Sequence, residues 1–189
     1  MPGLFDLESH LVFYRSYHFN QTNVTIHLIC IPIILLSTIA FLSPLHPLSP
    51  NPVLNLGTLL AWSYGAYYVL LDWKVGVPAA SVLVYFAYFI GNVYRGLSDA
   101  GKDEFIKVAV GLHVLSWLAQ FYGHGVHEKR APALLDNLLQ ALVLAPYFVA
   151  FEIAFFLGYR TDLKKTMDNR AGVIVRDFIQ QNKAKKAAS

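Results

Sequence analysis

The chain has 189 residues, of which 56% are hydrophobic and only 14% are charged. Soluble domains carry about 45–50% apolar and about 25% charged residues, so this composition excludes an ordinary soluble protein. The single cysteine, Cys30, excludes an intramolecular disulfide. The net charge of +3 is small, but eight of the fifteen Lys and Arg residues follow Tyr159. A basic end on an apolar chain favours the cytosolic side of a membrane over a nucleic-acid partner.

The N-terminal stretch MPGLFDLESHLVFYRSYHF predicts an amphipathic helix and not a signal peptide. It has acidic residues early, no basic region and no small-residue cleavage site. His10, Tyr14 and His18 are spaced four apart, so they share one face if the stretch is helical. We expect this helix to lie in the membrane interface.

Five apolar stretches follow, each near the roughly 20 residues with which a helix spans a bilayer. They are 24–42, 53–71, 75–94, 105–122 and 134–157. The fifth contains Pro146, together with the polar residues Asn137, Gln140 and Glu152. Because proline kinks a helix, we weigh a re-entrant hairpin here against a straight fifth span.

The predicted fold class is therefore all-α: a polytopic membrane protein of about four transmembrane helices, with a re-entrant helical hairpin as a candidate addition. We expect one membrane-embedded catalytic domain over residues 1–158. Residues 159–189 are expected to form a basic, cytosolic C-terminal tail.

Two histidines, His18 and His27, lie on either side of the sequence FNQTN, at the start of the first apolar stretch. In a continuous helix nine residues turn through about 900°, which would put the two histidines on opposite faces. FNQTN is suited to breaking the helix, because Asn20 is turn-prone and Thr22 or Asn23 can cap a new one. We expect the break to let both imidazoles face one point.

The fourth apolar stretch has a polar stripe at three- and four-residue steps. Its members are His113, Trp117, Gln120, His124 and Glu128. His124, His127 and Glu128 fall within about one helical turn, a spacing that can ligate a metal. His113 lies about 16 Å further along an unbroken helix, so we leave it out of the site. Polar residues at membrane depth are functional candidates, although helix capping stays open as their role.

These two regions resemble a known family, the endoplasmic-reticulum 2-hydroxy fatty acid dioxygenases of phytosphingosine breakdown. The resemblance runs from about Leu7 to Leu157. Its first motif is His-x-Asn-x-x-Asn-x-x-x-His, at His18, Asn20, Asn23 and His27. Its second is Gln-Phe-x-Gly-His with a glutamate soon after, at Gln120, Phe121, Gly123, His124 and Glu128. The chain departs from the family at Gln21, where a proline is usual, and at His127, where an aromatic or aliphatic residue is common.

The resemblance implies a multi-pass enzyme of the endoplasmic reticulum membrane that carries out fatty acid alpha-oxidation with Fe(II). Such an enzyme uses O₂ to convert a 2-hydroxy fatty acid into the fatty acid one carbon shorter. Imidazoles and carboxylates independently suit non-haem iron, and open coordination positions would admit O₂ and the substrate head.

Site residues follow from the resemblance in three groups. The expected metal ligands are His18, His27 and His124, with His127 as a spare candidate. Glu128 is expected as a fourth ligand or as a partner that orients a histidine. Asn20, Asn23 and Gln120 would position the ligands or the substrate head. Lys129 and Arg130, with Asn23, would bind the substrate carboxylate.

Two alternatives stay open at this point. A membrane di-iron hydroxylase would need several paired histidine clusters, whereas only His124 and His127 form a close pair here. A non-enzymatic membrane scaffold or lipid-binding protein would use the polar residues as helix caps. It predicts no bound metal, and tolerance of His18→Ala or His124→Ala.

Overall fold

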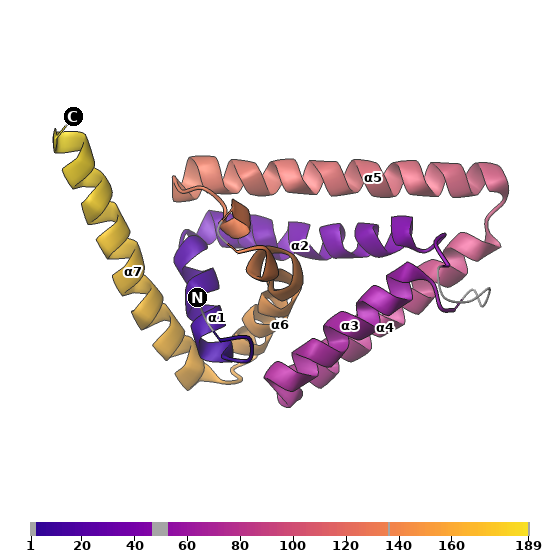
Figure 1. Cartoon of the computed structure of the whole chain (residues 1–189), viewed down its shortest axis with the longest axis horizontal. Helices are drawn as coiled ribbons and strands as arrows, with labels where there is room; N and C mark the ends of the chain where they lie inside the picture. The colour runs from indigo at the N-terminus through magenta and orange to yellow at the C-terminus, as the bar shows by residue number, and fades with distance from the viewer. Residues whose placement is uncertain (1–2, 47–52, 136, 189) are drawn as a thin grey trace. The chain divides into compact units, whose positions relative to one another are not determined.

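The computed structural model describes residues 3–46, 53–135 and 137–188, and every regular element in these ranges is helical. Figure 1 shows the seven α-helices of this part of the chain. They are α1 (Leu7–Tyr17), α2 (Gln21–Leu42), α3 (Leu56–Leu71), α4 (Trp73–Gly96), α5 (Asp99–Tyr122), α6 (Ala145–Phe156) and α7 (Thr161–Ala188). Two π-helical segments, Gly123–Glu128 and Leu139–Leu144, and a 3₁₀ turn, Ala133–Leu135, complete the list. The predicted all-α fold class is confirmed.

Four helices of the described chain are long and apolar enough to cross a membrane. They are Gln21–Leu42, Trp73–Gly96, Asp99–Glu128 and Leu139–Phe156. The expected number of four spans is confirmed, but the fifth apolar stretch supplies one of them in place of the second. The second apolar stretch forms α3, which has only 16 residues. Large apolar side chains such as Tyr85, Leu115 and Leu118 are exposed, as lipid contact requires.

The fifth apolar stretch is one continuous helical run from Leu139 to Phe156, and not the re-entrant hairpin that we weighed as an alternative. Pro146 does not end the run: it lies where the π-helical segment Leu139–Leu144 passes into α6. Local π-helical geometry lets a membrane helix accommodate the hydrogen bond that proline cannot make.

The chain divides into two compact units. One is Met1–Ile26 with Tyr122–Ser189, and the other is His27–Phe121. In the second unit α3 packs along α4. The close approach of these helices depends on Gly76, because a Cβ there would overlap the backbone of Tyr68. Asp72 caps α4 by accepting hydrogen bonds from two N–H groups of its first turn.

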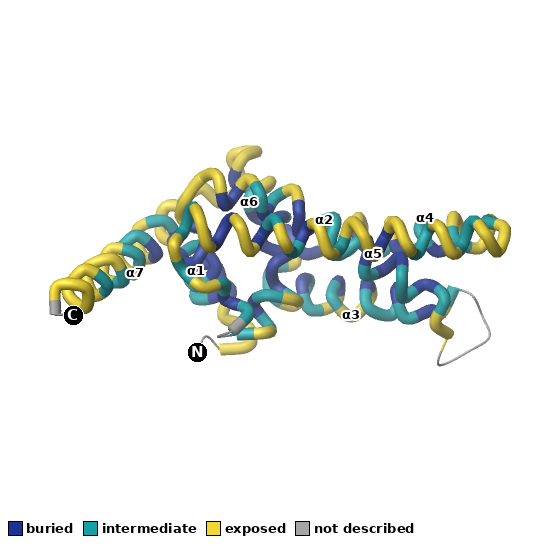
Figure 2. Tube along the Cα trace, turned by 90° about the horizontal axis from the view of Figure 1, so that it is seen from above, coloured by how far each residue is buried: buried dark blue, intermediate teal, exposed yellow. Residues whose placement is uncertain are grey.

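In the first unit, α1 forms the centre and contacts both α6 and α7. Its residues Leu11 and Tyr14 are buried, and Phe148 and Phe151 of α6 are buried too. The chain reverses after α6 with positive φ angles at Gly158 (80°) and Arg160 (56°). α7 then lies along α1 (Figure 1), and its C-terminal half is exposed (Figure 2). The basic C-terminal segment is therefore a packed helix over its first half.

Candidate metal site

The turn between α1 and α2 places the first histidine. α1 ends at Tyr17 and α2 begins at Gln21, so the expected helix break at FNQTN is confirmed. Asn20 is the residue that caps α2, and not Thr22 or Asn23 as the sequence suggested. Its Oδ1 accepts hydrogen bonds from the N–H groups of Thr22 (2.9 Å) and Asn23 (3.4 Å). An asparagine at the N-cap reaches the second and third helical N–H groups in this way.

His18 is buried at the C-cap of α1, and a backbone carbonyl sets its tautomer. Its Nδ1 lies 2.9 Å from the carbonyl oxygen of Tyr14. Because a carbonyl only accepts, Nδ1 carries the proton, and Nε2 is the nitrogen with a lone pair. The ring stacks on Tyr14 (centroids 4.1 Å apart), which in turn stacks on Phe148 (4.2 Å). Burial raises the pKa of the Tyr14 hydroxyl, and the charge of Glu152 adds to the rise.

The second histidine-bearing element is the π-helix Gly123–Glu128, which continues directly from α5. Single-turn π-helices occur frequently at functional sites. Gly123 is buried, and a Cβ at this position would overlap Oδ1 of Asn23. Glycine therefore lets the π-helix approach the first turn of α2. The approach leaves the rings of His124 and His18 with centroids 4.8 Å apart, at an interplanar angle of 67°.

His27 completes a group of three buried imidazoles. The division between the two units falls inside α2, just before His27, so one continuous helix carries both Asn23 and His27. His18, His27 and His124 each offer a ligand nitrogen, and these atoms all lie within 4.8 Å of one another. Three nitrogens at about 2.1 Å from one ion lie roughly 3–3.5 Å apart, so a small contraction would close the group on a metal. The residues present fit a mononuclear metal ion.

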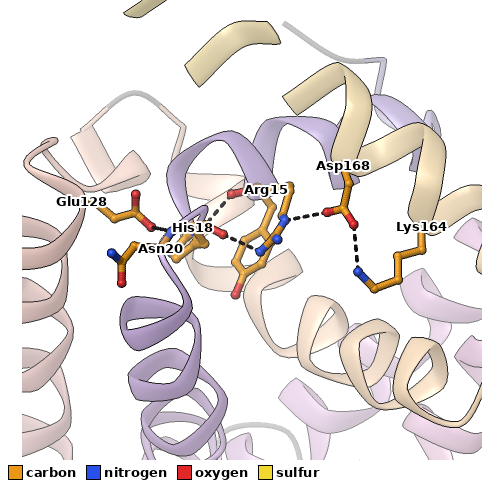
Figure 3. A network of polar contacts seen from close by, with 7 residues as sticks. Arg15, His18, Asn20, Glu128, Lys164 and Asp168 are labelled. Atoms are coloured by element: carbon orange, nitrogen blue, oxygen red, sulfur yellow. Dashed lines mark hydrogen bonds and ion pairs between the residues drawn. The ribbon is translucent and has the colours of Figure 1, made fainter. Parts of the chain in front are cut away.

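Glu128 makes contacts with the asparagines of the first motif. Its Oε1 accepts a hydrogen bond from the N–H of Asn20 (2.7 Å) and one from Nδ2 of Asn23 (3.2 Å). Figure 3 shows this carboxylate beside Asn20. A negative charge at the N-terminus of α2 is favourable, because the N–H groups there carry a partial positive charge. Within the described residues, the metal-ligand group consists of the three histidines, and Glu128 is not a member.

The other sequence-predicted residues lie around this group in different environments. His127 is half-buried, with its ring edge-on to Tyr122 at 5.5 Å. Lys129 is exposed and adopts φ 52°, ending the π-helix. Arg130 is held against the fold: its Nη1 donates to the carbonyl of Ser16 (2.9 Å), and its guanidinium lies 3.4 Å from the Tyr17 ring centre.

Gln120 lies four residues before His124 along the same helical run, and only 6% of it is exposed. Its Nε2 has no hydrogen-bond partner among the described residues. A buried donor left in this state costs about 1–3 kcal/mol, so the position suits a ligand that brings an acceptor oxygen. His113, by contrast, is engaged: its Nδ1 lies 3.0 Å from Oγ of Ser37, and Nε1 of Trp117 donates to its Nε2 at 3.0 Å. His113 lies outside the group His18, His27 and His124.

Arg15 also lies at the site, and the sequence did not indicate this role for it. Arg15 donates from Nη1 to the carbonyl of His18 (2.9 Å) and from Nε to Oδ1 of Asp168 on α7 (2.8 Å). Partial burial alone would raise the pKa of the Asp168 carboxyl. The hydrogen bonds and charges of Lys164 and Arg15 outweigh burial, and they hold this pKa below its usual value. Arg15 and Asp168 are 153 positions apart, and no local pattern predicts such a pair.

Fold and site together define a helical, multi-pass membrane protein with a candidate mononuclear metal centre at one end of α2. The chain belongs to the family described as 2-hydroxy-palmitic acid dioxygenase Mpo1-like, whose sequence profile matches residues 4–157. It is 39% identical over 179 residues to the 2-hydroxy-palmitic acid dioxygenase MPO1 of Saccharomyces cerevisiae, covering 95% of this chain and 97% of that protein. No solved structure matches the chain. The family resemblance stated from the two motifs is confirmed, and the chain belongs to a family of enzymes.

Proposed function

We propose that this protein is an Fe(II)-dependent 2-hydroxy fatty acid dioxygenase of the endoplasmic reticulum membrane. It converts a 2-hydroxy fatty acid and O₂ into the fatty acid one carbon shorter, as a step of phytosphingosine breakdown. The observation that carries the proposal is the buried group His18, His27 and His124, which lies inside the segment that matches the dioxygenase family. The membrane supplies both the substrate and the apolar surroundings for its acyl chain.

The three histidines are the proposed iron ligands. Imidazole suits iron, zinc, copper and nickel, but a reaction that consumes dioxygen calls for a redox-active metal. Fe(II) with open coordination positions would supply the redox chemistry through which dioxygen reacts with the hydroxy acid. The carbonyl of Tyr14 holds the proton of His18 on Nδ1, so Nε2 is the nitrogen that would bind the iron. Burial of all three rings keeps bulk water away from the reacting groups.

Glu128 acts by positioning, in this proposal, and not as a fourth ligand. Its carboxylate ties the π-helix that carries His124 to Asn20 and Asn23 at the start of α2. The π-helix and α2, which each carry a proposed ligand, are thereby fixed relative to each other. His127 stays outside the ligand set.

The substrate head needs a donor for its oxygens and a cation for its carboxylate. Gln120 offers a buried amide N–H without a partner among the described residues. Lys129 is exposed one residue beyond the π-helix, where its ammonium can pair with a carboxylate at the membrane face. Arg130 contributes mainly as an anchor, because its guanidinium already contacts Ser16 and Tyr17. Asn23, tied to Glu128, is available to orient the head through the same network.

Loss of the carboxyl carbon makes the former C2 the new carboxyl carbon, so the substrate must carry oxygen on C2. We therefore expect oxygen uptake by the detergent-purified, iron-loaded protein with 2-hydroxypalmitate and none with palmitate. Mass spectrometry should find the C15 acid as product. His18→Ala, His27→Ala and His124→Ala should abolish uptake, whereas His46→Ala, at an exposed histidine, should not. Equal uptake with both acids, or none with either, would refute the proposal. Co-fractionation with an endoplasmic reticulum marker tests the location.

A further inference from the structure

The C-terminal helix α7 has no part in the function proposed above, and it lies outside the family match, which ends at residue 157. Yet it packs along α1, the helix whose C-cap is His18. Asp168 of α7 contacts Arg15, three residues before that histidine. A helix at the end of the chain is thus connected to a proposed metal ligand through one side chain.

Arg15 holds the His18 turn from the α1 side. Its Nη1 donates to the His18 carbonyl at 2.9 Å, and the His18 N–H donates back to the carbonyl of Arg15 at 3.2 Å. The guanidinium also lies 5.2 Å from the ring centre of Phe19, the next residue of the turn. Only 15% of the Arg15 side chain is exposed, so its position is set by these partners and not by solvent.

Asp168 fixes the orientation of that guanidinium. Its Oδ1 accepts from Nε of Arg15, and its Oδ2 is held by Nζ of Lys164 at 2.8 Å (Figure 3). A guanidinium can serve two acceptors at once because its N–H groups point in fixed directions from one plane. Without Asp168, a largely buried cation would lose the carboxylate that its Nε contacts and turn toward water, releasing the His18 carbonyl.

The same turn is held on its other side by Glu128, which accepts from the N–H of Asn20. His18 therefore lies between two anchors, one from the π-helix and one from α7. Loosening either anchor moves the imidazole relative to His124 without removing a ligand.

We propose that α7 is a positioning element of the metal site, in which Asp168, acting through Arg15, holds His18 in the geometry that binds the metal. The inference rests on the proposed role of His18 as a ligand. Removing a residue that orients a metal ligand typically weakens metal binding about 10–100-fold.

The chain offers a matched control. Arg170 of α7 pairs with Glu8 of α1, an ion pair between the same two helices. Glu8 lies ten residues before His18, about 15 Å along a helix, and has no place at the turn. Asp168→Asn and Arg170→Gln should therefore weaken the packing of α7 on α1 to a similar extent. Only Asp168→Asn should also weaken metal binding.

The test is titration of the full-length, metal-free protein in detergent with Co(II), whose visible spectrum reports coordination geometry, alongside a melting curve of each variant. We expect Asp168→Asn to bind Co(II) about tenfold more weakly with an altered spectrum, and Arg170→Gln to bind as the wild type. Arg15→Lys keeps the charge, but a single ammonium cannot reproduce both contacts of the fork. It should lose affinity while melting near the wild-type temperature.

If Asp168→Asn and Arg15→Lys both bind Co(II) with the affinity and spectrum of the wild type, the inference is overturned, but the proposed metal site is not. Equal loss of affinity in Asp168→Asn and Arg170→Gln, in step with melting temperature, would also overturn it, because α7 would then act only by docking. No binding of Co(II) or Fe(II) by the wild type would overturn the metal site and this inference together.

Discussion

The close approach of the π-helix to α2 gives a sharp test at Gly123. A Cβ at this position would overlap Oδ1 of Asn23, a side chain that is completely buried. Gly123→Ala must therefore either displace Asn23 or push the π-helix away from α2. Gly125 lies in the same π-helix, and a Cβ there meets nothing within 4 Å, so Gly125→Ala is the matched control.

The cost of Gly123→Ala has two parts. Overpacking of a filled site costs about 1–3 kcal/mol. If Asn23 gives way, its hydrogen bond to the Glu128 carboxylate is lost as well, which is about 1.5–3 kcal/mol for a charged acceptor. Replacing glycine inside a helix returns up to about 1 kcal/mol. With both parts counted, we expect a net loss of about 1.5–6 kcal/mol in the free energy of unfolding for Gly123→Ala, and a small gain for Gly125→Ala.

Thermal unfolding in detergent and Fe(II) binding by the two variants are the assays. Gly123→Ala should melt several degrees lower and bind Fe(II) more weakly, because His124 is the next residue. Combining it with Asn23→Ser, which removes the overlapping Oδ1, should recover part of the melting temperature and give a non-additive double-mutant cycle. Indistinguishable behaviour of Gly123→Ala and Gly125→Ala would refute the packing argument.

Three further predictions concern side chains around the site. The pKa of Asp168 is lower in the fold than its usual 3.8, so its contribution to stability is complete above about pH 4 and is lost as the pH falls through the folded value. Acid melting curves should therefore show a shallower fall in stability below pH 4 for Asp168→Asn than for the wild type. Asn20→Ala removes the cap of α2 and should lower stability by about 1 kcal/mol, measured by thermal unfolding. His113→Phe leaves Oγ of Ser37 without its imidazole partner and should lower the melting temperature while Fe(II) affinity is retained.

The three histidines that the structure brings together were expected from two local motifs and from the family resemblance that these motifs carry. A broken helix at FNQTN follows from the turn chemistry of asparagine, and it explains how His18 and His27 can approach each other. The stripe on the fourth apolar stretch predicted His124 on the same helical run as Gln120. The cap was misassigned by a few residues, because Asn20, Thr22 and Asn23 are all good caps and only the backbone decides among them.

What the sequence could not predict depends on contacts between distant segments. A π-helix has no sequence signature that distinguishes it from an α-helix. The π-helical conformation of GHGVHE could therefore not be predicted. The role of Gly123 becomes evident only when Asn23 is seen against it. The link from Asp168 through Arg15 joins the two ends of the chain, and nothing in either segment indicates the other. The role of Pro146 was ambiguous for another reason, since proline disrupts a regular α-helix, whereas a π-helical turn just before it can accommodate it.

The most direct test of the account is the iron content of protein purified without oxygen and reconstituted with Fe(II). Wild-type protein should hold about one iron per chain, as expected for one group of three imidazoles. His18→Ala, His27→Ala and His124→Ala should each lose it, while His46→Ala keeps it. Iron retained by all three site variants, or absent from correctly folded wild-type protein, would contradict the metal centre proposed here.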